Sequence, residues 1–187
     1  MIRKLLKYKN LETEQAIFNK YYERIYSTAF FITNDPHLSQ DITQDTFIKA
    51  FKNMSSLKDE QKLGAWLGTI ATTTSIDYIR KSRKWNDIVA EGSYIEQELH
   101  KKLKTNSPVE KLVELKFIKE TMFKAIDNLK PEHKQILLLK YEYDLKDHEI
   151  AEQLNLNIGT VKSRLYRAKE QLKEHLNKKD FKIGDIG

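Results

Sequence analysis

The hydrophobic positions of this 187-residue chain recur mainly at intervals of three and four residues. That spacing gathers apolar side chains on one side of an α-helix, and strand-like alternation of apolar and polar residues is rare. The chain also contains only six glycines and three prolines, the residues that most often interrupt helices. We therefore predict an all-α fold.

The three prolines mark joints between the predicted helices. Residues 34–36, Asn-Asp-Pro, combine a helix stop, an N-cap and a proline suited to a first turn. They separate a helix over about residues 11–33 from one over about 37–54. Residues 107–110, Ser-Pro-Val-Glu, form a capping box, and residues 129–132, Leu-Lys-Pro-Glu, open a further helix in the same manner.

The polar stretch from residue 85 to residue 106 has no clear hydrophobic period apart from a short helical piece near its centre. We interpret it as a flexible linker. The sequence then divides into an N-terminal helical domain over residues 1–84, the linker over 85–106, and a C-terminal helical domain over 107–187, in agreement with the size of small domains.

The composition favours nucleic acid as a partner and argues against several other classes. The net charge is +6, although membrane-surface proteins share such basicity. The absence of cysteine excludes disulfides and thiolate chemistry and fits a reducing cytoplasm. Five scattered histidines lack ligand spacing, so we expect no metal and no cofactor. With no signal-peptide pattern and no run of roughly 18 apolar residues, we expect a cytoplasmic protein.

A helix-turn-helix pattern lies near the C-terminus. Ile150, Ala151 and Leu154 form the inner face of one helix, residues 155–157 (Asn-Leu-Asn) form a turn, and a second helix follows. That second helix directs four apolar residues inward: Val161, Leu165, Ala168 and Leu172. The small Ala151 allows the two helices to approach closely, which leaves the second helix available for a DNA groove.

The outward side of the second helix carries hydrogen-bond donors, an aromatic ring and positive charge. Lys162, Ser163, Tyr166 and Arg167 lie opposite the apolar stripe, and Arg164 lies laterally, where it suits a phosphate better than a base. Charge is divided between the helices. Residues 156–179 have seven lysines and arginines against two glutamates, whereas residues 131–152 have three lysines against six acidic residues. Of the two helices, only the second therefore has the positive net charge that favours binding to DNA.

Residues 62–85 predict one long helix that ends in basic residues interleaved with aromatic ones. Leu63, Leu67 and Ile70 share a face, but Ile76 and Ile79 point elsewhere, so we expect the helix to be sandwiched between other elements. The basic end and the aromatic rings provide charges for a phosphate backbone and surfaces on which unpaired bases stack. Core aromatics beside a solvated basic helix end are the structural alternative.

The preceding helix, by contrast, has an acidic side. Asp41, Gln44, Asp45 and Ile48 share one face, whereas Phe47, Ala50, Phe51 and Met54 face inward. An apolar residue ringed by polar ones is typical of a protein-binding surface rather than a DNA-binding one. The chain shows no phosphate-binding glycine loop, nucleophile elbow or HExxH pattern, so we expect no enzymatic activity and no small-molecule substrate.

In their order along the chain, these segments resemble the extracytoplasmic-function (ECF) group of bacterial RNA polymerase sigma factors. The resemblance covers about residues 11–176 and rests on three segments: DITQDTFIKAF, WLGTIATTTSIDYIRKSR and EIAEQLNLNIGTVKSRLYRAKEQL. It implies that the protein binds core RNA polymerase, directs it to promoters and helps to open the DNA. It also implies a cognate anti-sigma protein, which in that group is often membrane-bound.

Carried over by position, the resemblance assigns three sets of residues. The minus-thirty-five promoter element would be read by Lys162, Ser163, Arg164, Tyr166 and Arg167. The minus-ten element would be engaged by Lys62, Trp66, Thr73, Arg80, Arg83 and Lys84, with Thr73 standing where the family often has asparagine. The clamp helices of the largest polymerase subunit would be bound by Asp41, Gln44, Asp45 and Ile48.

Two other classes of protein fit parts of the sequence. A free-standing helix-turn-helix regulator would use the C-terminal motif but has no need of the segment at residues 62–85. A nucleic-acid enzyme with an unrecognised active site is the third class. The N-terminal motif discriminates between these hypotheses and favours the sigma factor.

Overall fold

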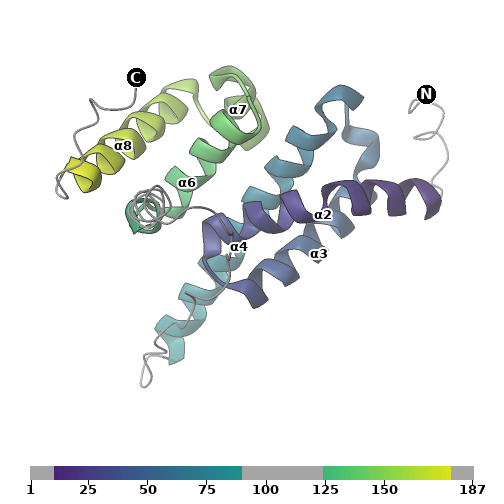
Figure 1. The fold of residues 1–187 in the computed structure, drawn as a ribbon, viewed down its shortest axis with the longest axis horizontal. Coiled ribbons are helices and arrows are strands. Elements are labelled where there is room, and N and C mark those ends of the chain that lie inside the picture. Colours follow the sequence, from purple (N-terminus) through teal and green to yellow (C-terminus); the bar gives the residue numbers. More distant parts are fainter. Residues whose placement is uncertain (1–10, 90–123, 178–187) are drawn as a thin grey trace, which may run out of the picture.

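A computed structural model describes residues 11–89 and 124–177 of the chain. Every regular element within these ranges is helical, which confirms the predicted all-α class (Figure 1). The α-helices are α2 (Leu11–Thr33), α3 (Pro36–Lys52), α4 (Leu63–Val89), α6 (Pro131–Leu137), α7 (Asp147–Leu154) and α8 (Ile158–Asn177). Shorter helical turns are η1 (Met54–Ser56), η2 (Glu60–Lys62) and η3 (Leu138–Glu142). Among the helices described, none is long and apolar enough to cross a membrane.

The first joint has the predicted chemistry. Asn34 adopts a left-handed conformation with φ of 54°, which ends α2. Asp35 is the N-cap of α3, and its carboxylate accepts a hydrogen bond from the Leu38 backbone N–H at 2.9 Å. Pro36 occupies the first helical position, where its missing N–H costs nothing.

Helix α4 is longer than the domain division implies. It continues to Val89, five residues beyond the predicted end of the N-terminal domain at residue 84. Residues 85–89 contain neither glycine nor proline, so nothing in the local sequence stops the helix there. The rest of the predicted linker and the capping box at residues 107–110 lie outside the described residues.

The N-terminal domain is a three-helix arrangement of α2, α3 and α4 around one core (Figure 1). Ile25, Leu67 and Ala71 are fully buried. As predicted from their spacing, Phe47 and Ala50 of α3 point into this core, with Phe51 and Met54 packed at its edge.

The C-terminal domain combines the helix-turn-helix of α7 and α8 with α6 and a π-helical turn, η3. Its core includes a cluster of seven buried residues: Ile136, Leu139, Tyr143, Leu145, Ile150, Ala151 and Val161. Asp144, which follows the π-helical turn, has a positive φ of 51°. This irregular backbone reverses the chain between α6 and α7 and places Tyr143 at the edge of the domain that faces α4.

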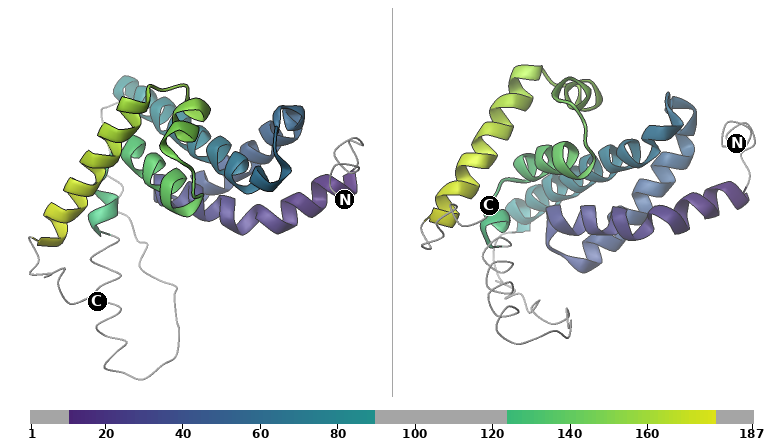
Figure 2. Two further views of the ribbon diagram at one scale, coloured as in Figure 1. Left: turned by 90° about the horizontal axis from the view of Figure 1, so that it is seen from above. Right: turned by 45° about the horizontal axis from the view of Figure 1, so that its top comes forward.

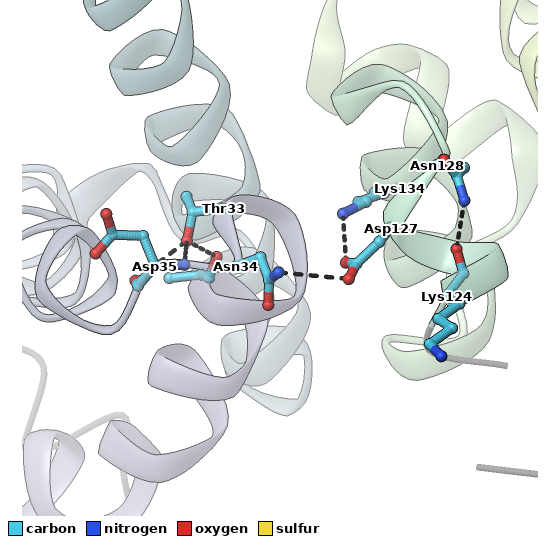
Figure 3. Close-up of polar contacts among 8 residues, drawn as sticks. Thr33, Asn34, Asp35, Lys124, Asp127, Asn128 and Lys134 are labelled. Carbon is cyan, nitrogen blue, oxygen red and sulfur yellow. Dashed lines mark hydrogen bonds and ion pairs between the residues drawn. The ribbon is translucent and has the colours of Figure 1, made fainter. Parts of the chain in front are cut away.

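The two domains are docked on each other through α4. One side of α4 packs against α2 and α3, and another contacts α6, η3 and α7, which confirms the predicted sandwiched helix (Figure 2). At the α2–α3 joint the Asn34 amide donates to Asp127 at 3.4 Å, and Lys134 lies 3.4 Å from the same carboxylate (Figure 3). Burial is the main cause of a lowered pKa at Lys134.

Candidate nucleic-acid and protein interfaces

The turn of the helix-turn-helix is fixed by backbone geometry. Asn155 adopts the left-handed conformation with φ of 50°, as expected for an asparagine at this position. The Leu156 N–H donates to the Ala151 carbonyl at 2.9 Å and closes the end of α7. Ala151 is 8% exposed, and its small side chain lets α7 and α8 pack closely around the buried Val161.

The outward side of α8 presents most of the predicted DNA-reading residues to solvent. Lys162, Tyr166 and Arg167 are exposed, and the Tyr166 side chain is 67% exposed, which is unusual for a tyrosine. Ser163 is half-buried, and its hydroxyl donates to the Thr160 carbonyl at 3.0 Å. Arg164 is also half-buried, in the lateral position that the helical wheel predicts, and lies near enough to Glu132 to help lower the pKa of that carboxyl.

The residues predicted to engage the minus-ten element occupy different surroundings along α4. Thr73 is exposed, whereas Trp66 is half-buried and packs against the N-terminal core, so its ring has the structural role that the sequence left open. Arg83 and Lys84 belong to α4, but their side chains lie outside the described residues. Lys62 and Arg80 are both held in ion pairs by the C-terminal domain.

These ion pairs involve an acidic surface that no local motif in the sequence marks. We call it the α6–α7 acidic face, and it consists of Glu132, Glu149 and Glu152. Glu132 pairs with Arg80 at 3.3 Å, and Glu152 pairs with Lys58 at 3.3 Å. Lys62 donates to Glu149, and this hydrogen bond lowers the pKa of Glu149 and raises that of Lys62. The negative net charge of residues 131–152 is a sequence signal from which this surface could have been found.

The second acidic surface lies on the N-terminal domain, and we call it the α3 acidic face: Asp41, Gln44, Asp45 and Ile48. Asp41 and Gln44 are exposed, and the Ile48 side chain is 51% exposed, as predicted. Asp45 differs because it is half-buried and accepts a hydrogen bond of 2.7 Å from the Tyr78 hydroxyl of α4. That bond is the main reason the pKa of Tyr78 rises to about 12. Asp45 therefore also holds α3 against α4.

Within residues 11–89 and 124–177, no group of three or more histidine, aspartate or glutamate side chains is arranged to hold a metal ion. A hollow with a volume of about 280 Å³ lies between the domains. Its charged lining residues include Arg24, Lys62 and Glu149. Lys62 pairs with Glu149, and Arg24 donates to the Glu142 carboxylate, each across the contact between the domains. The lining of this hollow therefore takes part in the contact between the domains.

Two protein-family profiles match the chain. One, Sigma-70 region 2, covers residues 17–85 and thus α2, α3 and most of α4. The other, Sigma-70, region 4, covers residues 120–172 and includes the helix-turn-helix.

Similar proteins extend the likeness over nearly the whole length. The ECF RNA polymerase sigma factor SigW of Bacillus subtilis is 31% identical over 182 residues, which are 94% of this chain and 97% of SigW. The ECF RNA polymerase sigma factor SigM of the same bacterium is 28% identical over 170 residues, which are 89% of this chain and 96% of SigM.

Solved structures share the fold. The sigma factor RpoE from Bartonella quintana, co-crystallised with the anti-sigma factor NepR, matches with a TM-score of 0.65 at 22% identity over 89% of this chain and 98% of RpoE. CnrH, in complex with the cytosolic domain of CnrY, matches with a TM-score of 0.55 at 18% identity over 90% of each chain.

Proposed function

Because this chain belongs to the ECF group of RNA polymerase sigma factors, which direct polymerase to promoters, we propose roles in that activity for three of its surfaces. The proposal rests on one observation: both sigma regions are present in order, and the likeness to SigW runs almost from end to end. A free-standing helix-turn-helix regulator would not need the region 2 domain. The sigma factor therefore explains more of the chain than that alternative does.

The first proposed role is recognition of the minus-thirty-five element by α8. Lys162, Tyr166 and Arg167 project from the exposed side of a helix whose opposite side is anchored by Val161 and Ala168. Such a helix enters a major groove, where arginine and lysine donate to guanine and tyrosine contacts either bases or phosphates. Arg164, at the lateral edge, binds a phosphate, and Ser163 contributes at the start of the helix.

The second proposed role is engagement of the melted minus-ten element by α4 and the turn before it. Lys62, Arg80, Arg83 and Lys84 provide charge along the strand, and exposed Thr73 lies where a base is read. Trp66 is half-buried, so we assign it to supporting this surface with only its exposed edge available for stacking.

The third proposed role is binding of core RNA polymerase by the α3 acidic face. Ile48 is an apolar side chain surrounded by Asp41, Gln44 and Asp45, the pattern of a small hot spot with a polar rim. An acidic rim suits a basic partner, and we assign it to the clamp helices of the largest polymerase subunit. Acting with polymerase places the protein in the cytoplasm, and the chain itself then needs no catalytic site.

We also infer a cognate anti-sigma protein as a partner. RpoE and CnrH share the fold. RpoE was co-crystallised with the anti-sigma factor NepR, and the CnrH structure is a complex with the cytosolic domain of CnrY. Such a partner controls a sigma factor by occupying surfaces that polymerase requires.

Reconstituted transcription tests the proposed function. Core RNA polymerase and this protein together should start transcription from a cognate promoter identified by mapping transcription starts after overexpression, and neither component alone should do so. Arg167→Ala should weaken promoter recognition while polymerase binding is retained. Failure of the protein to comigrate with core polymerase in gel filtration, where a known sigma factor does, would overturn the proposal.

A further inference from the structure

The outward side of α8 has a gap in its row of side chains. Gly159 precedes Ser163 by four residues and Tyr166 by seven, so the three residues lie on one side of the helix. Ala168, nine positions after Gly159, faces the opposite way and is fully buried. The second residue of α8 thus lies within the surface that we assign to the minus-thirty-five element, and it has no side chain.

The part of the chain that the structure describes gives no internal reason for this glycine. Gly159 is exposed, and a Cβ atom added there would meet no described atom within 4 Å. Its φ lies outside the left-handed region, so alanine can adopt the same backbone and is the better helix former. The left-handed residue of the preceding turn is Asn155 instead. For the stability of the protein alone, alanine would be preferable at position 159.

Two glycines of α4 show what an internal reason looks like. A Cβ atom at Gly64 would lie 3.2 Å from a ring carbon of Tyr21, and one at Gly68 would overlap the ring of Tyr143. Each of these glycines makes room for a side chain of the protein itself. Gly159 has open space in the same position relative to its helix, so the group for which it makes room belongs to another molecule.

We propose that Gly159 is a positioning residue, which lets the start of α8 approach the floor of the major groove at the minus-thirty-five element. The inference rests on the proposed function, because that function assigns α8 to this element. The N-terminal residues of a recognition helix contact the base edges. A side chain at position 159 would therefore meet the bases early, whereas a glycine allows the helix to lie deeper.

The depth of the helix decides whether its donors reach the bases. A direct hydrogen bond spans about 2.7–3.2 Å between heavy atoms, whereas an added carbon needs about 3.5–4 Å from its neighbours. Withdrawal of α8 by roughly 1 Å to admit that carbon would take the donors of Lys162 and Arg167 out of hydrogen-bond range. Attraction to the phosphates changes much less over such a distance. Sequence specificity should thus be lost before general affinity for DNA.

Gly159→Ala tests this inference, because stability and recognition should change in opposite directions. The melting temperature should rise by about 1–4 °C, since alanine is compatible with the helical backbone. Holoenzyme reconstituted with core polymerase is then titrated onto labelled promoter duplexes with either the mapped minus-thirty-five element or a scrambled one. Affinity for the mapped element should fall roughly tenfold, whereas affinity for the scrambled element should stay within a factor of about two.

Gly159→Leu separates close approach from backbone freedom. Leucine is nearly as good a helix former as alanine, so the melting temperature should again be no lower than that of the parent protein. Its longer side chain should weaken binding to the mapped element further, on the order of a hundredfold. Ala16→Leu, at an exposed position of α2, is the control for an added apolar side chain and should leave both affinities unchanged.

Unchanged preference for the mapped element in both Gly159 variants would overturn the inference. Equal losses in the alanine and leucine variants would also do so, because they would assign the effect to backbone freedom. A lowered melting temperature would show that the glycine serves the fold instead. A parent holoenzyme that does not prefer the mapped element would contradict the proposed role of α8 itself, whereas a parent that prefers it and variants that retain the preference would contradict only the role of Gly159.

Discussion

The protein has two acidic surfaces that differ in what faces them. In the α6–α7 acidic face each glutamate forms an ion pair with a lysine or arginine of the N-terminal domain. In the α3 acidic face neither Asp41 nor Asp45 forms an ion pair with any of the residues described. The first surface has its basic partner within the chain, whereas the second has no ionic partner among the residues described, which agrees with our proposal that it binds polymerase.

The comparison shows that acidity alone does not assign a surface on a basic protein. Both faces would be repelled by DNA. The α6–α7 acidic face nevertheless binds basic residues of its own chain, whereas the α3 acidic face has the composition of a binding site for a basic protein. The two faces differ in the exposure of the largely apolar side chain that lies in or beside each of them. Ile48 lies exposed within the α3 acidic face, whereas the apolar residue beside the α6–α7 acidic face, Tyr143, is buried in the contact it makes.

The largest expected effect comes from placing a cation in the middle of the α3 acidic face. Ile48→Lys should weaken binding to core polymerase by about 2 kcal/mol, roughly thirtyfold, because it removes an apolar anchor and repels a basic partner. The melting temperature should hardly change, since Ile48 is 51% exposed. Titration of labelled polymerase measures the affinity.

A matched control is available for this substitution. Ile158→Lys makes the same chemical change at another exposed isoleucine, in the C-terminal domain, and should leave polymerase affinity within a factor of about two. Equal losses in the two variants would show that added charge, rather than the α3 acidic face, controls the affinity.

The next effect concerns Asp45, the member of the α3 acidic face that is partly structural. Tyr78→Phe removes the hydroxyl that donates to Asp45 and should lower the free energy of unfolding by about 1 kcal/mol. Polymerase affinity should stay near that of the parent protein, because Asp41 and Ile48 are untouched. Chemical denaturation measures the loss, which would be absent if the bond did not form in solution.

The raised pKa of Tyr78 gives this prediction a spectroscopic counterpart. Because the folded protein favours the neutral phenol, the stabilisation is complete below the ordinary pKa of 10 and is lost as the pH rises through about 12. Absorbance titration should detect one tyrosine that ionises near the upper value. Asp45→Asn should return this ionisation toward 10, and an unchanged titration would indicate that Asp45 is not the cause.

Local signals explain what the sequence predicted correctly. The limits of α2 follow from its hydrophobic period and from Asn34, and the turn before α8 follows from an asparagine that tolerates positive φ. The exposed sides of α3 and α8 follow from the same periodicity. Each of these features depends on residues within a few positions of one another.

The docking of the domains was not predictable in this way. Lys62 and Glu149 are 87 positions apart, and neither residue has a local feature that requires the other. Gly68 appears in the sequence only as a glycine within a helix, and its purpose emerges when Tyr143 lies over it. The basic end of the helix predicted over residues 62–85 and the negative net charge of residues 131–152 were both visible in the sequence. Charge complementarity between distant segments, however, does not specify a contact.

The smallest expected effect tests whether the α6–α7 acidic face acts through its charges. Arg80→Glu or Glu132→Arg alone should lower the free energy of unfolding by about 0.3–1 kcal/mol, because the pair is partly exposed and screened by solvent. In chemical denaturation the double substitution should restore most of that loss, since the opposite charges meet again. If the double variant were as destabilised as either single variant, the ion pair would not contribute to the contact between the domains.

The pH dependence of the same pair has a defined sign. Burial raises the pKa of Glu132, but its backbone hydrogen bond and Arg80 outweigh burial, so the pKa lies below the usual 4.5. The contribution of this carboxylate to the free energy of unfolding is therefore present above pH 4.5 and disappears as the pH falls through the lowered value. The free energy of unfolding of the parent protein should decrease over that acid range, and less so in Arg80→Glu, where the attraction is already absent. A decrease of the same size in Arg80→Glu would assign the acid destabilisation to other carboxylates, of which Glu149, the partner of Lys62, is the next to substitute.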